Sequence, residues 1–136
     1  MIPDTALITI PATAGDVNFS YINDTGRMMK LAYTHLLVTT DATVANRYPE
    51  VWILDADGAL VMDSHAGAPV VASLSNRHIE FMQGIYRETA FINGTLQVPI
   101  AIDLLLIPGW ELRFRLNGGV AGDSYSGRAT LLGYRI

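Results

Sequence analysis

The residues that most resemble a reactive site are Gly122, Asp123 and Ser124, within the segment GGVAGDSYSG near the C-terminus. A hydrolase nucleophile elbow needs Gly-x-Ser-x-Gly on a strand-to-helix turn, which exposes the serine beside a helix N-terminus. Here position 126 is serine, and a strand pattern follows instead of a helix. The segment also lacks the lysine of a phosphate-binding loop. We interpret it as a long glycine-rich turn whose tip is a candidate contact loop.

Two other patterns raise the question of a metal ion. The sequence DADG at residues 55–58 is acidic, but a calcium loop needs glycine at its sixth position and glutamate at its twelfth. Here glycine is fourth and the twelfth residue is alanine. The three histidines share no spacing that would place two imidazoles on one face of an element; they are His35, His65 and His78. We therefore predict no metal site and no cofactor.

Aromatic side chains suggest a carbohydrate platform as one further kind of site, because tryptophan and tyrosine rings are flat and amphipathic. The candidates are Trp52, Trp110, Tyr86 and Tyr125. Both tryptophans lie within apolar strand patterns, which favours a core position. Tyr125 lies in the polar turn, so we expect it to be exposed and available to a ligand or partner.

The elements that must position these residues are strands. Short apolar or alternating runs recur between turn residues at intervals of about 8–12 residues, the spacing of an all-β sandwich or barrel. Asp57-Gly58 predicts a hairpin between residues 51–54 and 59–62, and Asn93-Gly94 predicts a second turn between residues 90–92 and a strand starting near Leu96. We expect further strands at residues 100–108 and 128–136.

Two segments define the strand pattern most sharply. Residues 27–40 place some apolar side chains at helical spacing, but their β-favouring residues and apolar character on both faces favour a central strand. Residues 110–116, WELRFRL, alternate between apolar and charged side chains, as in a strand with one buried face. The fold class we predict is an all-β, single-domain antiparallel β-sandwich, jelly-roll-like, with about eight strands.

Composition restricts the possible functions. The chain has 136 residues, 50% hydrophobic and 16% charged, a formal net charge of −4, one lysine and no cysteine. Without clustered positive charge, direct nucleic-acid binding is not expected. No apolar run is long enough for a membrane span, and we expect no signal peptide because the N-terminus has no basic region. The apolar surplus favours self-association or docking on a partner.

The order of features from residue 47 to residue 136 resembles small β-sandwich virion proteins of tailed bacteriophages. The motifs are the NRYPEVWILDADGALV hairpin, the small-residue segment SHAGAPVVAS, FMQGIYRE, and LLLIPGWELRFRLNGG followed by GDSYSGRATLLGYRI. This resemblance implies a head decoration or cement protein, or a neck or tail component, without catalytic residues. Residues 1–26 lie outside the resemblance, as an N-terminal strand or arm, and residues 27–136 form the sandwich.

The resulting hypothesis is a non-enzymatic structural protein of a virion, assembled in the host cytoplasm as a homo-oligomer and docked on the major capsid protein or another virion protein. The alternative is a glycan- or receptor-binding module of a phage tail or fibre; a metal-dependent enzyme would need two or more converging histidines. The candidate partner contacts lie in the N-terminal arm, the small-residue segment and the glycine-rich turn: Ile2, Leu7, Ile8, Ile10, Ala68, Val70, Val71, Asp123, Ser124 and Tyr125.

Overall fold

The fold consists of strands, as the sequence predicts. The computed structural model describes residues 2–101 and 105–135, and no helix occurs in these described residues, so none there is long and apolar enough to cross a membrane. The ten strands are β1 (Ile2–Ala14), β2 (Phe19–Ile22), β3 (Met29–Thr39), β4 (Tyr48–Leu54), β5 (Leu60–His65), β6 (Arg77–Met82), β7 (Thr95–Pro99), β8 (Leu105–Leu106), β9 (Glu111–Asn117) and β10 (Ser124–Arg135).

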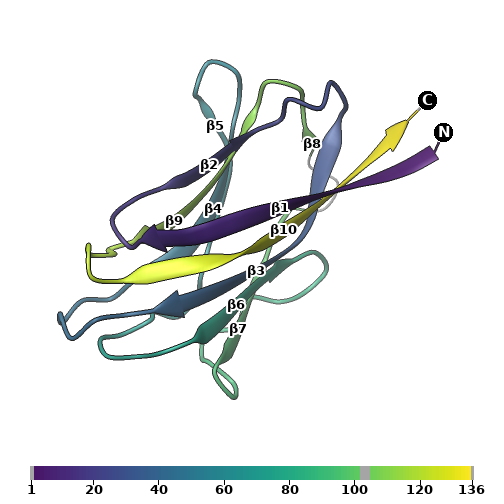
Figure 1. Ribbon diagram of the computed structural model, residues 1–136. Coiled ribbons are helices and arrows are strands. Elements are labelled where there is room, and N and C mark those ends of the chain that lie inside the picture. Colours follow the sequence, from purple (N-terminus) through teal and green to yellow (C-terminus); the bar gives the residue numbers. More distant parts are fainter. Residues whose placement is uncertain (1, 102–104, 136) are drawn as a thin grey trace.

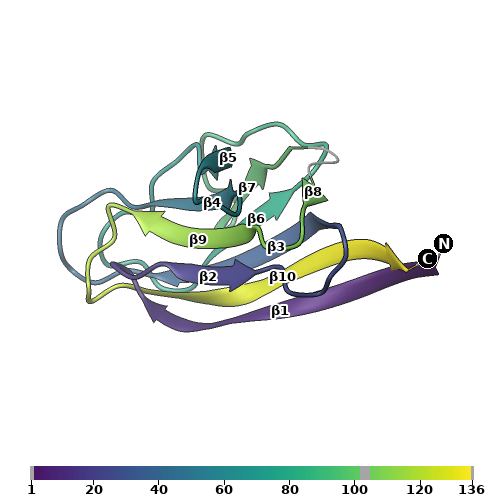
Figure 2. The same ribbon diagram turned by 90° about the horizontal axis from the view of Figure 1, so that it is seen from above.

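The strands form two sheets that face each other (Figures 1 and 2). The larger sheet has the order β1-β10-β3-β6-β7, with the two-residue strand β8 pairing with the start of β3. The smaller sheet has the order β2-β9-β4-β5. Strands β1 and β2 belong to different sheets, so residues 2–22 contribute one strand to each layer of the sandwich.

Eight of the strands are paired in a nested antiparallel pattern. The outermost two in the sequence pair with each other, β1 with β10, and the same rule continues inward through β2 with β9, β3 with β6 and β4 with β5. A double sheet wound in this way is a jelly roll. The predicted β-sandwich is confirmed, and its eight framework strands are supplemented by β7 and β8.

Strand β7 departs from the expected antiparallel arrangement, because it runs parallel to β6. Parallel strands need a connection that returns to the starting end of the first strand, and residues 83–94 supply it. At its end, Asn93 (φ 51°) and Gly94 (φ 77°) form the predicted turn with left-handed backbone. The strand expected at residues 90–92 is wrong: only an isolated bridge between Ile92 and Thr95 forms there.

The other local predictions have clear outcomes. The Asp55 side chain accepts hydrogen bonds from the backbone N–H groups of Asp57 and Ala59, both at 2.9 Å, so this segment is the predicted hairpin turn between β4 and β5. Residues 27–40 contain the central strand β3, as predicted. The strand expected at residues 100–108 is reduced to β8 in the described part, and residues 102–104 lie outside the described residues.

The core lies between the inner faces of the sheets. Phe81 of the larger sheet and Phe114 of the smaller sheet meet edge-to-face, with ring centroids 6.3 Å apart, and both are fully buried. Trp110 packs against this core.

The core position expected for Trp52 is wrong. Trp52 alternates along β4 with the buried Val51 and Ile53, so its side chain faces outward. There its indole N–H donates to Asp63 and the Arg115 guanidinium covers its ring.

The central aromatic pair predicts a large stability effect. Phe114→Ala removes a fully buried ring and leaves a cavity between the sheets, so the free energy of unfolding should fall by about 3–5 kcal/mol. Tyr86→Ala removes an aromatic ring that is 95% exposed, and it should change stability by less than about 0.5 kcal/mol. Urea unfolding followed by circular dichroism measures both values. Equal losses would contradict the assignment of Phe114 to the core.

Candidate functional site

The glycine-rich turn, which raised the question of catalysis, is built around a buried ion pair. Asp123 accepts a hydrogen bond from Arg47 Nε at 2.9 Å on Oδ2, and another from Arg47 Nη2 at 3.1 Å on Oδ1. Both side chains are fully shielded from solvent. Two charges so deeply buried are stable only when they are paired and hydrogen-bonded. Asp123 is therefore a structural residue, and the prediction that it lies in an exposed contact loop is wrong.

The remaining hydrogen bonds of the pair connect loops that are far apart in the sequence. Asp123 also accepts from the backbone N–H groups of Asp41 and Val120, each at 2.9 Å. Arg47 Nη2 donates to the carbonyl oxygen of Thr43, and the Arg47 backbone exchanges two hydrogen bonds with Val70. The loops β1–β2, β3–β4 and β9–β10 meet at one end of the sandwich, and β1 begins and β10 finishes at the other end (Figure 1). The ion pair thus holds this end together.

The electrostatics of Asp123 follow from these contacts. Burial alone would raise the pKa of its carboxyl group, but the hydrogen bonds from Arg47, Val120 and Asp41 outweigh burial and leave the pKa below its usual value. The carboxylate is therefore ionised throughout the neutral range.

Tyr125 was predicted to be exposed, and that prediction is wrong. Only 2% of it is accessible, because its position in β10 points between the sheets in line with Ala129 and Leu131. Its hydroxyl group lies 2.7 Å from the carbonyl oxygen of Val17 and 3.1 Å from that of Phe114, so it has backbone acceptors inside the core. Burial raises the pKa of Tyr125 to about 12.

The other predicted contact residues divide by exposure. Ala68, Val70 and Ile10 are buried, and Ile8 is half-buried. Leu7 (57% exposed) and Val71 (45% exposed) are accessible, as is Ser124. Ile2 begins β1, and its side chain lies outside the described part. The sequence predicted these contacts from the apolar N-terminal arm, the small-residue segment and the glycine-rich turn, and none of these local features separates a core position from a surface position.

Strand β1 is the long open edge of the larger sheet. It has 13 residues and pairs with β10 on one side. Asp4 is its single charged residue, and it contains no lysine, arginine or glutamate. Natural sheets usually block such edges with charges, prolines, bulges, short strands or covering segments. In β1, Pro3, Pro11 and a register irregularity between Ile10 and Thr13 lie toward the two ends, and residues 5–9 contain neither proline nor charge. An edge that is long and nearly uncharged is suited to pairing with a strand from another chain.

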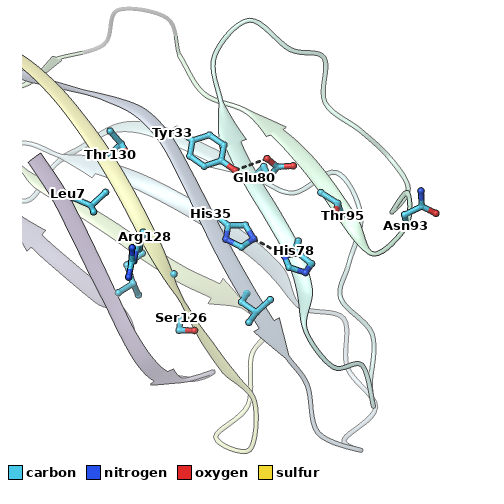
Figure 3. Close-up of a pocket in the computed structure, with 13 residues that line it drawn as sticks. Leu7, Tyr33, His35, His78, Glu80, Asn93, Thr95, Ser126, Arg128 and Thr130 are labelled. Atoms are coloured by element: carbon cyan, nitrogen blue, oxygen red, sulfur yellow. Dashed lines mark hydrogen bonds between the residues drawn. The ribbon is translucent and has the colours of Figure 1, made fainter. Parts of the chain in front are cut away.

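A groove lies on the outer face of the same sheet (Figure 3). Its volume is about 870 Å3, and its lining comes from β1, β10, β3, β6 and the start of β7. The fold brings two of the three histidines together here: His35 Nε2 lies 2.7 Å from His78 Nδ1, with ring centroids 5.0 Å apart and ring planes inclined by 16°. Beside them the Tyr33 hydroxyl donates to Glu80 at 2.6 Å. Linear spacing did not reveal this cluster, because it forms across paired strands.

The groove is not arranged as a metal centre. No group of three or more metal-ligating side chains is placed to hold an ion in the part of the chain that the structure describes. His65 lies on β5 in the smaller sheet, away from the pair. The tyrosine in the groove stays protonated at neutral pH, because burial and, to a lesser extent, the hydrogen bond to Glu80 raise the pKa of Tyr33 to about 12.

Comparison with known proteins gives distant structural matches. No protein-family model matches the sequence, and no curated protein matches it. A structure of infectious bursal disease virus, Gx strain, is similar over 96% of this chain with 18% identity and a TM-score of 0.46. The crystal structure of the VP2 subviral particle of the same virus is similar over 96% of this chain with 17% identity and a TM-score of 0.43. The matched part is 32% of each of those chains.

The buried ion pair predicts a non-additive stability effect. Arg47→Met leaves the buried Asp123 charged without its cation and should cost about 3–5 kcal/mol of unfolding free energy. Asp123→Asn should cost less, because Arg47 Nη2 also donates to Asp41 Oδ1 at 3.1 Å and keeps that carboxylate as a partner. The double variant removes both charges and should lose less than the sum of the two single losses. Urea unfolding of all four proteins measures the coupling. Additive losses would show that the two charges do not depend on each other.

The pKa of Asp123 predicts acid sensitivity. Its folded pKa lies below the unfolded value of about 3.9, so its contribution to stability is present above pH ~4 and is lost as the pH falls through the folded pKa. Thermal unfolding between about pH 6 and pH 2 should show a steeper acid loss for the wild type than for Asp123→Asn. Parallel curves for the two proteins would mean that the carboxyl group of Asp123 has the same pKa in the folded and the unfolded state.

Proposed function

We propose that this chain is a non-enzymatic structural protein of a bacteriophage virion, which stabilises the capsid as a decoration or cement protein. It acts as a homo-oligomer docked on the major capsid protein or another virion protein, after assembly in the host cytoplasm. The observation that carries this proposal is the open edge of β1, which is suited to joining chains into a larger assembly.

The contrast with the other sheet edges supports this use of β1. The opposite edge of the larger sheet, β7, is covered by the preceding segment: the Glu88 side chain accepts from the Gln97 backbone N–H, and Ile92 exchanges hydrogen bonds with Thr95. In the smaller sheet, the edge strands β2 and β5 have 4 and 6 residues. Short or covered edges resist pairing with other chains. Strand β1 has 13 residues, and its edge-protecting features, namely Pro3, Pro11 and the register irregularity between Ile10 and Thr13, lie toward its two ends.

The mechanism follows from mass action. A chain that binds the assembled shell and not its free subunits stabilises the shell in proportion to how tightly and how often it binds. An antiparallel edge strand can pair with the same strand of a second copy about a twofold axis, which closes the interface after two chains. Exposed aliphatic side chains such as Leu7 and Val71 then remain as candidate contacts to the capsid.

The groups that suggested enzymatic chemistry support a non-catalytic role. Asp123 is held by Arg47, and Asp55 is occupied by the backbone of its own turn. The alternative glycan site at Tyr125, Asp123 and Trp110 is not supported. Asp123 and Tyr125 are each only 2% exposed, so they do not form a binding surface with Trp110.

The experiment that tests this proposal is blocking the β1 edge. Thr9 is exposed on β1, and Thr9→Lys introduces charge that must be desolvated when another strand pairs there. Sedimentation of the purified wild type should show a dimer or larger oligomer, and Thr9→Lys should weaken its association at least about tenfold, or about 1.4 kcal/mol.

A second experiment tests the place of the protein in the virion. Mass spectrometry of purified particles of the virus that encodes the chain should find it in many copies.

The matched control is Thr89→Lys, the same substitution at an exposed threonine in the segment preceding the covered edge β7. It should leave the oligomer unchanged. A wild-type chain that stays monomeric at about 100 μM and is absent from purified particles would contradict the proposed function.

A further inference from the structure

The groove on the outer face of the larger sheet has a chemical character that the proposed structural role does not require. Its polar lining mixes hydroxyl, imidazole, carboxylate, amide and guanidinium groups (Figure 3). Leu7 and Leu37 add apolar surface beside them. A ligand that fits such a lining must both donate and accept hydrogen bonds and must also have an apolar side.

We propose that this groove binds a neutral saccharide chain. Sugar hydroxyl groups donate and accept hydrogen bonds, and the C–H face of a sugar ring packs on apolar or aromatic side chains. The volume of about 870 Å3 lies within the range of ligand sites, about 300–1,000 Å3. The site lies on the face of the sheet and not on its edge, so its failure would leave the proposed structural function standing.

The histidine pair supports a ligand of this type. Because His35 Nε2 and His78 Nδ1 are 2.7 Å apart, one proton lies between them when both rings are neutral. Each neutral imidazole has one N–H and one acceptor nitrogen. The two remaining ring nitrogens of the pair are therefore one donor and one acceptor, whichever ring supplies the shared proton. A sugar hydroxyl group can accept a hydrogen bond from the donor nitrogen or donate one to the acceptor nitrogen.

The electrostatics of His35 agree with a neutral ring at that position. Burial is the main cause that lowers the pKa of His35, the neighbouring His78 lowers it further, and Glu80 opposes both. Glu80 accepts from Tyr33 through Oε2. The charged groups that face the pair are Glu80 from β6 and Arg128 from β10, which is the cross-strand partner of His35.

Other ligand classes fit this lining less well. An anion requires net positive charge, but the guanidinium of Arg128 is balanced by the carboxylate of Glu80. A metal ion requires three or more converging ligands, which the described residues do not supply. An extended peptide requires free backbone groups, which the open edge of β1 offers and a sheet face does not.

Binding to defined oligosaccharides tests this proposal. The full chain is applied to immobilised tetramers of glucose, galactose, mannose and N-acetylglucosamine, with sialylated and sulfated oligosaccharides as charged comparators. At least one neutral tetramer should bind with a millimolar or lower Kd. Binding only to the charged comparators, or to none of the oligosaccharides, would overturn the proposal.

Variants locate the binding. Tyr33→Phe removes one hydroxyl group and His78→Ala breaks the imidazole pair, so each should weaken binding about tenfold. Arg128→Ala changes an exposed side chain and serves as a second test if the other variants unfold. Gln97→Ala is the matched control, because Gln97 faces outward on β7 without lining the groove. Equal affinities for all four variants would place the saccharide elsewhere and overturn the proposal.

Measuring the saccharide affinity as a function of pH adds a test whose result a general loss of structure would not reproduce. Protonation of His35 puts an N–H on both nitrogens of that ring, and His78 Nε2 is then a donor as well, so the pair loses its acceptor. Saccharide binding by the wild type should therefore fall several-fold as the pH is lowered from about 7 through the pKa of His35, which lies below the usual value of about 6.5, while the folded circular dichroism spectrum is retained. Affinity that is independent of pH in this range would contradict the role of the histidine pair.

Discussion

The interaction on which much of this structure depends is the buried ion pair between Arg47 and Asp123. Both side chains lie in an interior that would reject either charge alone, so the fold is favourable only when they meet. Arg47 also donates to the side chain of Asp41, and the other hydrogen bonds of the two side chains are to the backbone of the β3–β4 and β9–β10 loops. One pairing therefore determines how strands from both sheets are connected at this end of the sandwich.

The jelly roll explains why the candidate surfaces lie on one sheet. Nested pairing places the first and last strands side by side, so β1 becomes the edge of the larger sheet next to β10. The same arrangement makes β3 a central strand whose outer face is bordered by β10 and β6. Gly127 permits the close approach of β10 to β3, since a Cβ atom there would lie 1.9 Å from the carbonyl oxygen of His35. The open edge and the groove are thus two consequences of one strand order.

Local patterns predicted the elements well and the burial of individual residues less well. Alternation in residues 110–116 gave the correct inner face of β9, since Leu112, Phe114 and Leu116 are buried. Tyr125 was misjudged because serine and glycine neighbours suggest a turn, whereas β10 already begins at Ser124. Trp52 was misjudged because the run Val51–Leu54 is apolar throughout. Such a run contains no alternation to indicate which side chains face the core.

The sequence by itself determined the all-β class, the Asp-Gly hairpin, the central strand within residues 27–40 and the strand at residues 110–116. Each of these depends on backbone preference or on side-chain period over a few neighbouring residues. Only the tertiary structure decided that Arg47 meets Asp123, that His35 meets His78 and that β1 is an open edge. These contacts join residues 43 to 76 positions apart, or depend on which strand takes the outermost place. A single sequence contains no local signal for such pairings, because they are selected by the packing of the whole sandwich.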